Sequence, residues 1–214
     1  MKAAIFDLDG TLLDSMWLWK SLVNDYLKSI GIEPPEDLRE NLKKLSLLEG
    51  CYYMKDRFHL EKTPQVINDE IEELLSDYYG NQFTLKPFVH EILSEFKNRN
   101  IRMCLATATA DELVEMALKR LDIGDYFEFI QTSNNVGIGK SKPEFFQAVI
   151  NRLDLDAKDI WVFEDALHCI ISAKKCGLNV VALQDDSASE DIEEIKKLAD
   201  IYINNLSELN INSL

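Results

Sequence analysis

The sequence predicts an α/β protein, because strand patterns alternate with helix patterns over most of its length. Short apolar runs that end in polar residues recur along the chain, as expected of strands buried on both faces. These runs lie at residues 3–6, 103–107, 127–131, 160–164, 180–183 and, more weakly, 201–203. Amphipathic helical patterns separate several of them, at residues 89–96, 113–121 and 146–153. This alternation predicts a parallel, Rossmann-like sheet covered by helices.

Residues 15–79 break the alternation, because their apolar spacing is helical throughout. This all-helical insertion follows the first predicted strand directly. It therefore falls over the carboxyl ends of the strands, where open α/β sheets bind ligands, and it is a candidate lid. We predict two domains, which are an α/β core formed by residues 1–14 and 81–214 and a helical cap formed by residues 15–80.

The charge of the chain limits its partners. Its 214 residues carry a formal charge of −15, so the overall field repels nucleic acid and anionic membrane surfaces, and an anionic substrate needs a local cation. No stretch has the length of a transmembrane helix and the chain start lacks a secretory signal, which predicts a cytoplasmic protein. The four cysteines and three histidines lack zinc-site spacing. Nothing in the sequence demands more than a monomer.

Asp7-Leu8-Asp9-Gly10-Thr11 is the strongest chemical signal, because two carboxylates directly follow a buried strand. Each carboxylate opposes ionisation of the other unless both are paired, protonated or bound to a cation. A metal ion resolves that conflict. Taken alone, the five residues fit equally well an acidic turn that caps a helix.

Thr107 ends the second core strand, where we expect an anion site. Thr109 and Glu112 suit a capping box, which predicts that a helix begins immediately after Thr107. Free backbone N–H groups at such a helix start, together with the Thr107 hydroxyl, bind anions well. A plain N-capping segment is the alternative.

A lysine and two further acids complete the set. Ser141 and Glu144 suit a second capping box, which places Lys140 just outside a helix start, where it supplies a cation. The alternative is a solvated lysine, a description that fits the nearby Lys142 better. Glu164-Asp165 follow another buried strand, with hard oxygen ligands that suit magnesium, although Asp165 equally fits a helix cap.

In this order, the four groups of residues resemble the four motifs of the haloacid dehalogenase superfamily, in the branch with a small helical cap. The match spans nearly the whole chain and is similar to the phosphatase-like members that include beta-phosphoglucomutase. The resemblance implies a Mg²⁺-dependent phosphatase that hydrolyses the phosphate monoester of a small metabolite. One departure is Phe88, which follows Pro87 at a position where a glycine is common in the family.

The resemblance also implies roles. Asp7 is the expected nucleophile, which forms an aspartyl phosphate, and Asp9 is the expected general acid and base. Mg²⁺ is expected between a carboxylate oxygen of Asp7, the backbone carbonyl of Asp9 and the side chain of Asp165. The transferred phosphoryl oxygens are expected to be bound by Thr107, Ala108 and Lys140. Glu164 is expected to orient Lys140 or to reach the metal through water.

Two other functions stay open. A sugar phosphomutase similar to beta-phosphoglucomutase uses the same aspartyl phosphate, but Trp19 and Leu47 stand where those mutases carry a histidine and an arginine. A non-catalytic module that binds metal and phosphate is the alternative outside enzymes. Trp17, Trp19 and Leu47 are the candidate substrate contacts of the cap, although an aromatic stripe at helical spacing is more often core.

Overall fold

A computed structural model describes residues 1–19, 21–42 and 45–214, and in these ranges it contains one six-stranded parallel sheet. Its strands are β1 (Ala3–Phe6), β2 (Arg102–Thr107), β3 (Ile130–Thr132), β4 (Ile160–Glu164), β5 (Asn179–Leu183) and β6 (Ile201–Ile203). The order β3-β2-β1-β4-β5-β6 makes the first strand of the chain central. The predicted parallel α/β core is confirmed. Only β3 begins clearly later than its apolar pattern predicted, because a 3₁₀ turn ends just before Phe127.

Helices cover both faces of the sheet. The helices are α1 (Met16–Trp19), α2 (Leu22–Ser29), α3 (Leu38–Leu42), α4 (Leu47–Phe58), α5 (Pro64–Asp77), α6 (Val89–Asn98), α7 (Asp111–Arg120), α8 (Ser133–Val136), α9 (Pro143–Leu153), α10 (Leu167–Lys175) and α11 (Ile192–Leu198). A π-helical turn, η1 (Tyr78–Gln82), follows α5, and the 3₁₀ turns are η2 (Gly124–Tyr126), η3 (Ala157–Asp159), η4 (Asp186–Asp191), η5 (Leu206–Glu208) and η6 (Ile211–Ser213). Within the described ranges, no helix is both long and apolar enough to cross a membrane.

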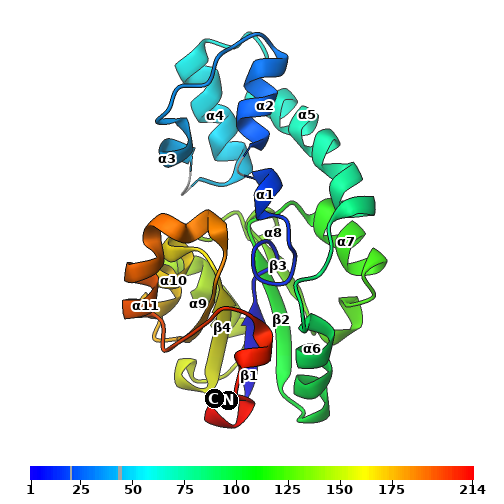
Figure 1. The fold of residues 1–214 in the computed structure, drawn as a ribbon, viewed down its shortest axis with the longest axis vertical. Helices are drawn as coiled ribbons and strands as arrows, with labels where there is room; N and C mark the ends of the chain where they lie inside the picture. The colour runs from blue at the N-terminus through cyan, green and yellow to red at the C-terminus, as the bar shows by residue number, and fades with distance from the viewer. Residues whose placement is uncertain (20, 43–44) are drawn as a thin grey trace.

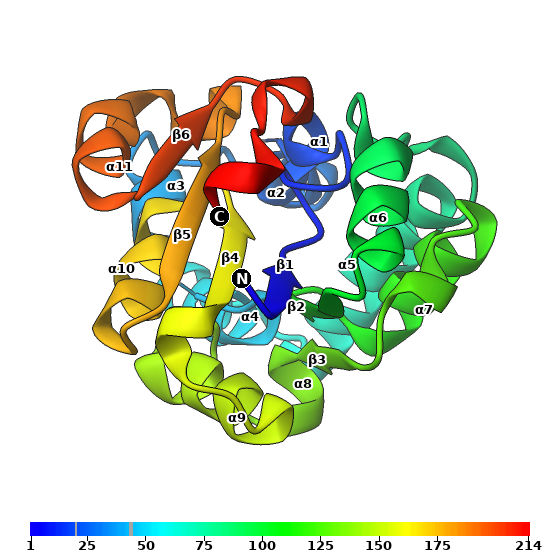
Figure 2. The same cartoon turned by 90° about the horizontal axis from the view of Figure 1, so that it is seen from below.

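The side chains of β1 alternate between two apolar clusters. Figure 2 shows α6 and α7 on one side of the sheet and α9, α10 and α11 on the other. Ala4 and Phe6 pack in the cluster that contains the apolar faces of α6 and α7, whereas Ala3 and Ile5 pack with α9 and α10. The strand is therefore buried on both faces, as its uninterrupted apolar run predicted.

The segment from α1 to α5 forms a helical layer over one edge of the sheet (Figure 1). That edge is the carboxyl end, because β1 runs toward it and leads into the loop before α1. Buried side chains of α2, α4 and α5 fill the interior of the layer, including Leu27, Met54, Ile67 and Ile71. The layer thus lies where the sequence predicts an insertion, while its separation as a domain of residues 15–80 stays a prediction.

Two segments connect the sheet with the helical layer, and aromatic rings join them. The first passage is residues 7–19, which include α1, and the second is residues 78–88, which include η1. Trp17 on the first passage makes edge contacts with Tyr78 and Phe83 on the second, with ring centroids 5.7 and 5.8 Å apart. Tyr79 contacts Phe83 in the same manner, at 5.0 Å. Aromatic pairs of this geometry stabilise a structure by about 0.5–1.5 kcal/mol each beyond their buried area. These rings therefore hold the two passages side by side.

Phe88, the residue found where a glycine is common, adopts a left-handed backbone with φ of 69° at the start of α6. A Cβ atom makes this conformation unfavourable, and glycine avoids the penalty. Phe88 therefore occupies a turn conformation that glycine adopts more easily.

Candidate active site

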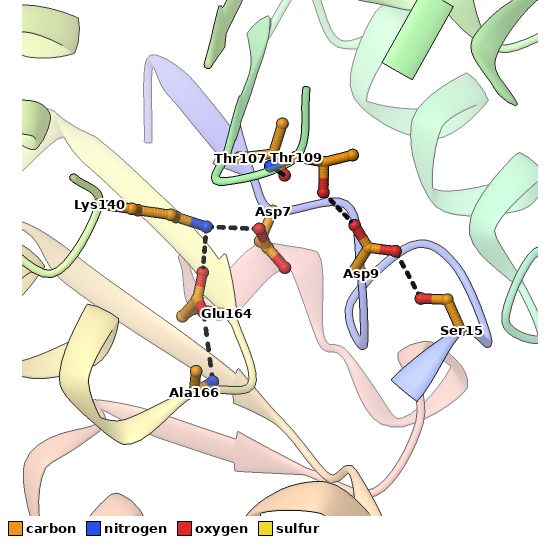
Figure 3. Close-up of polar contacts among 8 residues, drawn as sticks. All are labelled: Asp7, Asp9, Ser15, Thr107, Thr109, Lys140, Glu164 and Ala166. Carbon is orange, nitrogen blue, oxygen red and sulfur yellow. Dashed lines mark hydrogen bonds and ion pairs between the residues drawn. The ribbon is translucent and has the colours of Figure 1, made fainter. Parts of the chain in front are cut away.

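Three neighbouring strands bring the predicted site residues together at the carboxyl edge of the sheet. In the register of the sheet, Phe6 of β1 pairs with Leu105 of β2 and Phe163 of β4. The residues that follow these pairs therefore meet at one edge. Asp7 comes after β1, Thr107 ends β2 and Glu164 ends β4, and Figure 3 shows their side chains around one centre.

Lys140 is the buried cation of the site. Its Nζ lies 2.5 Å from Asp7 Oδ1 and 2.6 Å from Glu164 Oε2 (Figure 3). The three side chains are at most 8% exposed, so water screens these ion pairs little. The second oxygen of Glu164 accepts a hydrogen bond from the Ala166 N–H, which orients the carboxylate. Lys142, the other lysine of this loop, is exposed.

Three carboxyl groups, from Asp7, Glu164 and Asp165, form a buried cluster that could hold a cation. One oxygen of each lies within 4.8 Å of the others. When all three carboxyl groups are ionised, they and the one ammonium group leave a formal charge of −2, which a divalent cation balances. Asp165 Oδ2 is buried without a hydrogen-bond partner in the described structure, as expected of an oxygen reserved for a ligand. Hard oxygen donors of this kind suit Mg²⁺.

The charges in the cluster perturb one another. Burial, followed by repulsion from Glu164, raises the pKa of Asp7 to about 8, and the ion pair with Lys140 opposes this rise. Burial and the carboxylates of Glu164 and Asp7 also raise the pKa of Asp165 well above its ordinary value. The folded protein thus holds acids that resist ionisation until a further positive charge arrives.

Gly10 makes room beside Asp165. Its backbone is left-handed, with φ of 84°, and a Cβ atom at this position would overlap with Asp165 Oδ2 and approach Met16. Glycine is therefore needed here for both its conformation and its lack of a side chain. This explains why the acidic motif after β1 continues with a glycine.

The Asp9 carboxyl group lies beside the acid cluster, on the side of Thr109 and Ser15, and accepts hydrogen bonds from three hydroxyl groups. Thr109 Oγ1 donates to Asp9 Oδ2 at 2.5 Å, while Ser15 Oγ and Tyr79 Oη donate to Oδ1 at 2.6 and 2.7 Å (Figure 3 shows the first two). Sequence reasoning missed Ser15 and Tyr79 as site residues. Ser15 lies close to the acidic motif, but no sequence pattern connects Tyr79 with a residue 70 positions earlier.

The predicted cap of the helix after Thr107 is wrong. α7 begins at Asp111 with Ala110 as its N-cap and no side-chain hydrogen bond, and the Thr109 hydroxyl contacts Asp9 instead. The helix therefore starts later than predicted. Between Thr107 and the helix, the Thr109 N–H donates to the buried Thr107 Oγ1 at 3.1 Å, and this turn leaves Ala108 exposed.

The second predicted capping box is also wrong. α9 begins at Pro143 with Lys142 as its N-cap, and no side chain caps the helix. Proline at the first helical position needs no partner for a backbone N–H, which weakens the need for a capping side chain. Lys140 still precedes the helix start, as predicted.

A cavity of about 300 Å³ lies between the acid cluster and the helical layer. Asp7, Thr107 and Ala108 line its sheet side. The helical layer contributes a largely apolar wall that includes Trp19, Leu42, Leu47, Leu48 and Met54. Arg39 also lines the cavity, and its guanidinium donates to the Ser187 carbonyl oxygen at 2.6 Å, which ties the layer to η4.

Trp17 differs from the other two predicted cap contacts in its position relative to this cavity. Trp19 and Leu47 line the cavity, whereas Trp17 lies outside it, with 53% of its surface exposed. Its indole N–H donates to the Asp14 carbonyl oxygen at 3.1 Å, and its ring packs on Tyr78 and Phe83. Neighbouring helix positions point in different directions, so Trp17 and Trp19 face different surroundings, and a substrate contact by Trp17 stays a prediction.

The fold and the buried acid–lysine cluster beside a cavity together define an α/β enzyme. The chain belongs to the haloacid dehalogenase-like hydrolase family, whose sequence model matches residues 4–183. The superfamily assignment made from the sequence motifs is therefore confirmed, as is its consequence that the protein is a hydrolase.

Relatives and structural neighbours agree with this assignment. The chain is 28% identical to the Phosphorylated carbohydrates phosphatase of Thermotoga maritima over 178 residues, which cover 83% of this chain and 82% of the relative. It is 27% identical to Beta-phosphoglucomutase of Bacillus subtilis over 198 residues, which cover 86% and 83%. A crystal structure of a CbbY mutant from Rhodobacter sphaeroides in complex with xylulose-1,5-bisphosphate shares the fold, with a TM-score of 0.83, 21% identity and coverage of 98% and 96%.

Proposed function

We propose that the protein is a Mg²⁺-dependent phosphatase that hydrolyses a small phosphate monoester through an aspartyl phosphate on Asp7. One observation carries the proposal. Asp7, Glu164, Asp165 and Lys140 are buried together at the carboxyl edge of the sheet, and a cavity opens directly onto them. Placing three acids around one lysine without water is costly unless the site serves a charged ligand.

The first step is attack by Asp7 on phosphorus. Lys140 pairs with Asp7 Oδ1, which leaves the other carboxylate oxygen as the nucleophile. The phosphorus–oxygen bond to the substrate breaks as the aspartyl phosphate forms. Phosphate monoesters react so slowly in water that an enzyme must lower the barrier by roughly 20 kcal/mol, most of it through positioning and charge neutralisation.

Asp9 serves as the general acid and base. It donates a proton to the leaving oxygen in the first step. In the second step it accepts a proton from the water that attacks phosphorus, so that the bond to Asp7 breaks and inorganic phosphate leaves. The Thr107 hydroxyl, the backbone at Ala108 and the Lys140 ammonium group hold the transferred phosphoryl oxygens. Glu164 fixes Lys140 through the ion pair at 2.6 Å.

Mg²⁺ would be held by Asp7, the backbone carbonyl of Asp9 and Asp165, with Glu164 close enough to assist. When bound, it neutralises the repulsion between an anionic nucleophile and an anionic phosphate. The unpartnered, buried Asp165 Oδ2 and the formal charge of −2 support this assignment.

The substrate is a small phosphorylated metabolite, since a cavity of about 300 Å³ matches the lower end of small-molecule sites. The relative from Thermotoga maritima, which is named as a phosphatase of phosphorylated carbohydrates, supports a sugar or polyol phosphate. A sugar phosphomutase is the second candidate, because beta-phosphoglucomutase is also a relative. Trp19 and Leu47 line the cavity wall at the positions where those mutases carry a histidine and an arginine, and their apolar side chains favour hydrolysis over that alternative.

Phosphate release separates these functions. With Mg²⁺, the protein is expected to release inorganic phosphate from p-nitrophenyl phosphate and from a panel of sugar and polyol monophosphates, and excess chelator is expected to stop the release. Conversion of a hexose 1-phosphate to the 6-phosphate without net phosphate release would identify a mutase. No turnover of any panel member would leave only a binding module.

The stability of the protein is expected to show a pH-dependent response to Mg²⁺. Between 3.8, the ordinary pKa of Asp7, and its raised value of about 8, the folded protein holds a proton that the unfolded chain has released. By linkage, the free energy of unfolding of the metal-free protein falls as pH rises through this window. Mg²⁺ binds the deprotonated carboxylate, so its stabilising effect grows over the same window.

Saturating Mg²⁺ is therefore expected to raise Tm by about 5–10 °C near pH 8, and by less than half as much near pH 5.5. Thermal unfolding with and without Mg²⁺ at the two pH values measures this difference. Asp165→Asn should remove most of the Mg²⁺ response. An equal response at both pH values in the wild-type protein would argue against metal binding by Asp7.

A further inference from the structure

Tyr79 is a buried tyrosine whose hydroxyl reaches the side chain of Asp9. It lies in η1, on the second passage between helical layer and sheet, and its side chain is fully buried. Tyr79 Oη lies 2.7 Å from Asp9 Oδ1. The backbone of the tyrosine is fixed from the sheet side, because Arg120 Nε of α7 donates to the Tyr79 carbonyl oxygen at 3.0 Å.

Trp19 determines the direction of the hydrogen bond between Tyr79 and Asp9. The indole Nε1 of Trp19 lies 3.2 Å from Tyr79 Oη. An indole N–H is only a donor, so the tyrosine oxygen accepts from Trp19. The single hydroxyl proton of Tyr79 is then left for Asp9. The result is a directed chain that runs from Trp19 through Tyr79 to Asp9 Oδ1.

The hydrogen-bond chain from Trp19 connects Asp9 to a different part of the protein than its contacts with Ser15 and Thr109 do. Ser15 and Thr109 contact Asp9 from the loops that follow β1 and β2. Trp19 belongs to α1, and its side chain also lines the wall of the cavity. The carboxylate of Asp9 is therefore joined to a residue that lies beside the substrate cavity.

We propose that Tyr79 and Trp19 are positioning residues that hold the Asp9 carboxyl group in the orientation it needs for proton transfer to the leaving group. This inference rests on the proposed phosphatase function. Neither residue transfers a proton itself. Their contribution is geometric, since a proton donor that is misplaced by about 1 Å loses much of its effect on the rate.

A positioning role for the acid depends on the leaving group. p-Nitrophenolate is a good leaving group and departs with little help from an acid. The alkoxide of glycerol 2-phosphate is a poor leaving group and requires a proton as the bond to phosphorus breaks. Loss of acid positioning therefore slows the alkyl ester selectively. Damage to folding, metal binding or phosphate binding slows both esters alike.

The test compares Tyr79→Phe with the wild-type protein on p-nitrophenyl phosphate, phenyl phosphate and glycerol 2-phosphate, with Mg²⁺ present. The kcat/KM for glycerol 2-phosphate is expected to fall by about 10- to 100-fold, because a general acid contributes roughly 10²–10⁴-fold when well placed. For p-nitrophenyl phosphate the expected fall is about threefold or less, and phenyl phosphate should lie between them. Trp19→Phe keeps the Tyr79 hydroxyl, so its kcat/KM values should fall in the same order across the three esters, but by less.

Tyr78→Phe is the matched control, because it removes the hydroxyl of the adjacent tyrosine, which contacts Trp17 and Phe83 through its ring. Tyr78→Phe should leave the ratio of kcat/KM for p-nitrophenyl phosphate to kcat/KM for glycerol 2-phosphate unchanged. Equal losses on all three esters in Tyr79→Phe, no loss, or a selective gain on glycerol 2-phosphate would overturn the positioning role while the phosphatase function stands. If the wild-type protein released phosphate neither from these three esters nor from the sugar and polyol monophosphates, the proposed function itself would fail, and the positioning role with it.

Discussion

Replacement of Asp7 by asparagine is expected to lower kcat for phosphate release by about 10⁴-fold or more, the largest effect of any single substitution in the site. The amide keeps the shape of the carboxylate but provides no anionic oxygen to attack phosphorus. In the proposed mechanism Thr107 and Lys140 still bind the phosphoryl oxygens in this variant, so KM is expected to change far less than kcat. Steady-state phosphate release from p-nitrophenyl phosphate with Mg²⁺ measures both quantities.

The same variant separates chemistry from folding. Burial and Glu164 disfavour the charged form of Asp7, and Lys140 keeps its ion pair with Glu164 in the variant. Without metal, the free energy of unfolding of Asp7→Asn is therefore expected to equal or exceed that of the wild-type protein. Asp14→Asn is the control, since Asp14 is an exposed acid near the same motif, and it should keep kcat. Turnover by Asp7→Asn within about tenfold of wild type would refute the nucleophile assignment.

Replacement of Lys140 by methionine is expected to impair both stability and turnover. Methionine fills a similar volume but leaves Asp7 and Glu164 buried without their shared cation. Removal of one partner from a buried ion pair typically costs about 3–5 kcal/mol. In a chain of 214 residues this corresponds to a fall in Tm of roughly 6–20 °C. Thermal unfolding of the metal-free protein measures this loss, and kcat should also fall by at least about 100-fold.

Lys142→Met is the matched control for this substitution. Lys142 lies two residues away in the same loop and is exposed, so its replacement should change Tm and kcat little. The pair of variants also tests which lysine serves the site. Similar losses in both variants, or a larger loss in Lys142→Met, would contradict the role of Lys140.

The sequence predicted the parts of the site that directly follow buried strands. Asp7, Thr107 and Asp165 each end or follow an apolar run, and the parallel sheet places such positions at one edge. The carboxyl groups of Asp7 and Asp165 accordingly have oxygens within 4.8 Å of each other. Lys140 was harder to predict, because Lys142 lies two residues away in the same loop; the structure buries Lys140 and leaves Lys142 exposed.

The remaining site residues could not be predicted because they depend on how the two passages pack. Tyr79 reaches Asp9 from the second passage, and the aromatic contacts among Trp17, Tyr78 and Phe83 pack that passage against the first. Thr109 matched a capping pattern, but its hydroxyl donates to Asp9 Oδ2 and α7 begins only at Asp111. Local sequence patterns carry no information about such contacts between residues far apart in the chain.

Gly10 has a consequence for how the site can vary. The space beside Asp165 exists because one residue of the motif has no Cβ atom, and its backbone dihedral angle is one that other residues seldom adopt. Any larger residue would displace the carboxylate, the backbone turn, or both. The geometry around Asp165 therefore allows almost no substitution at residue 10.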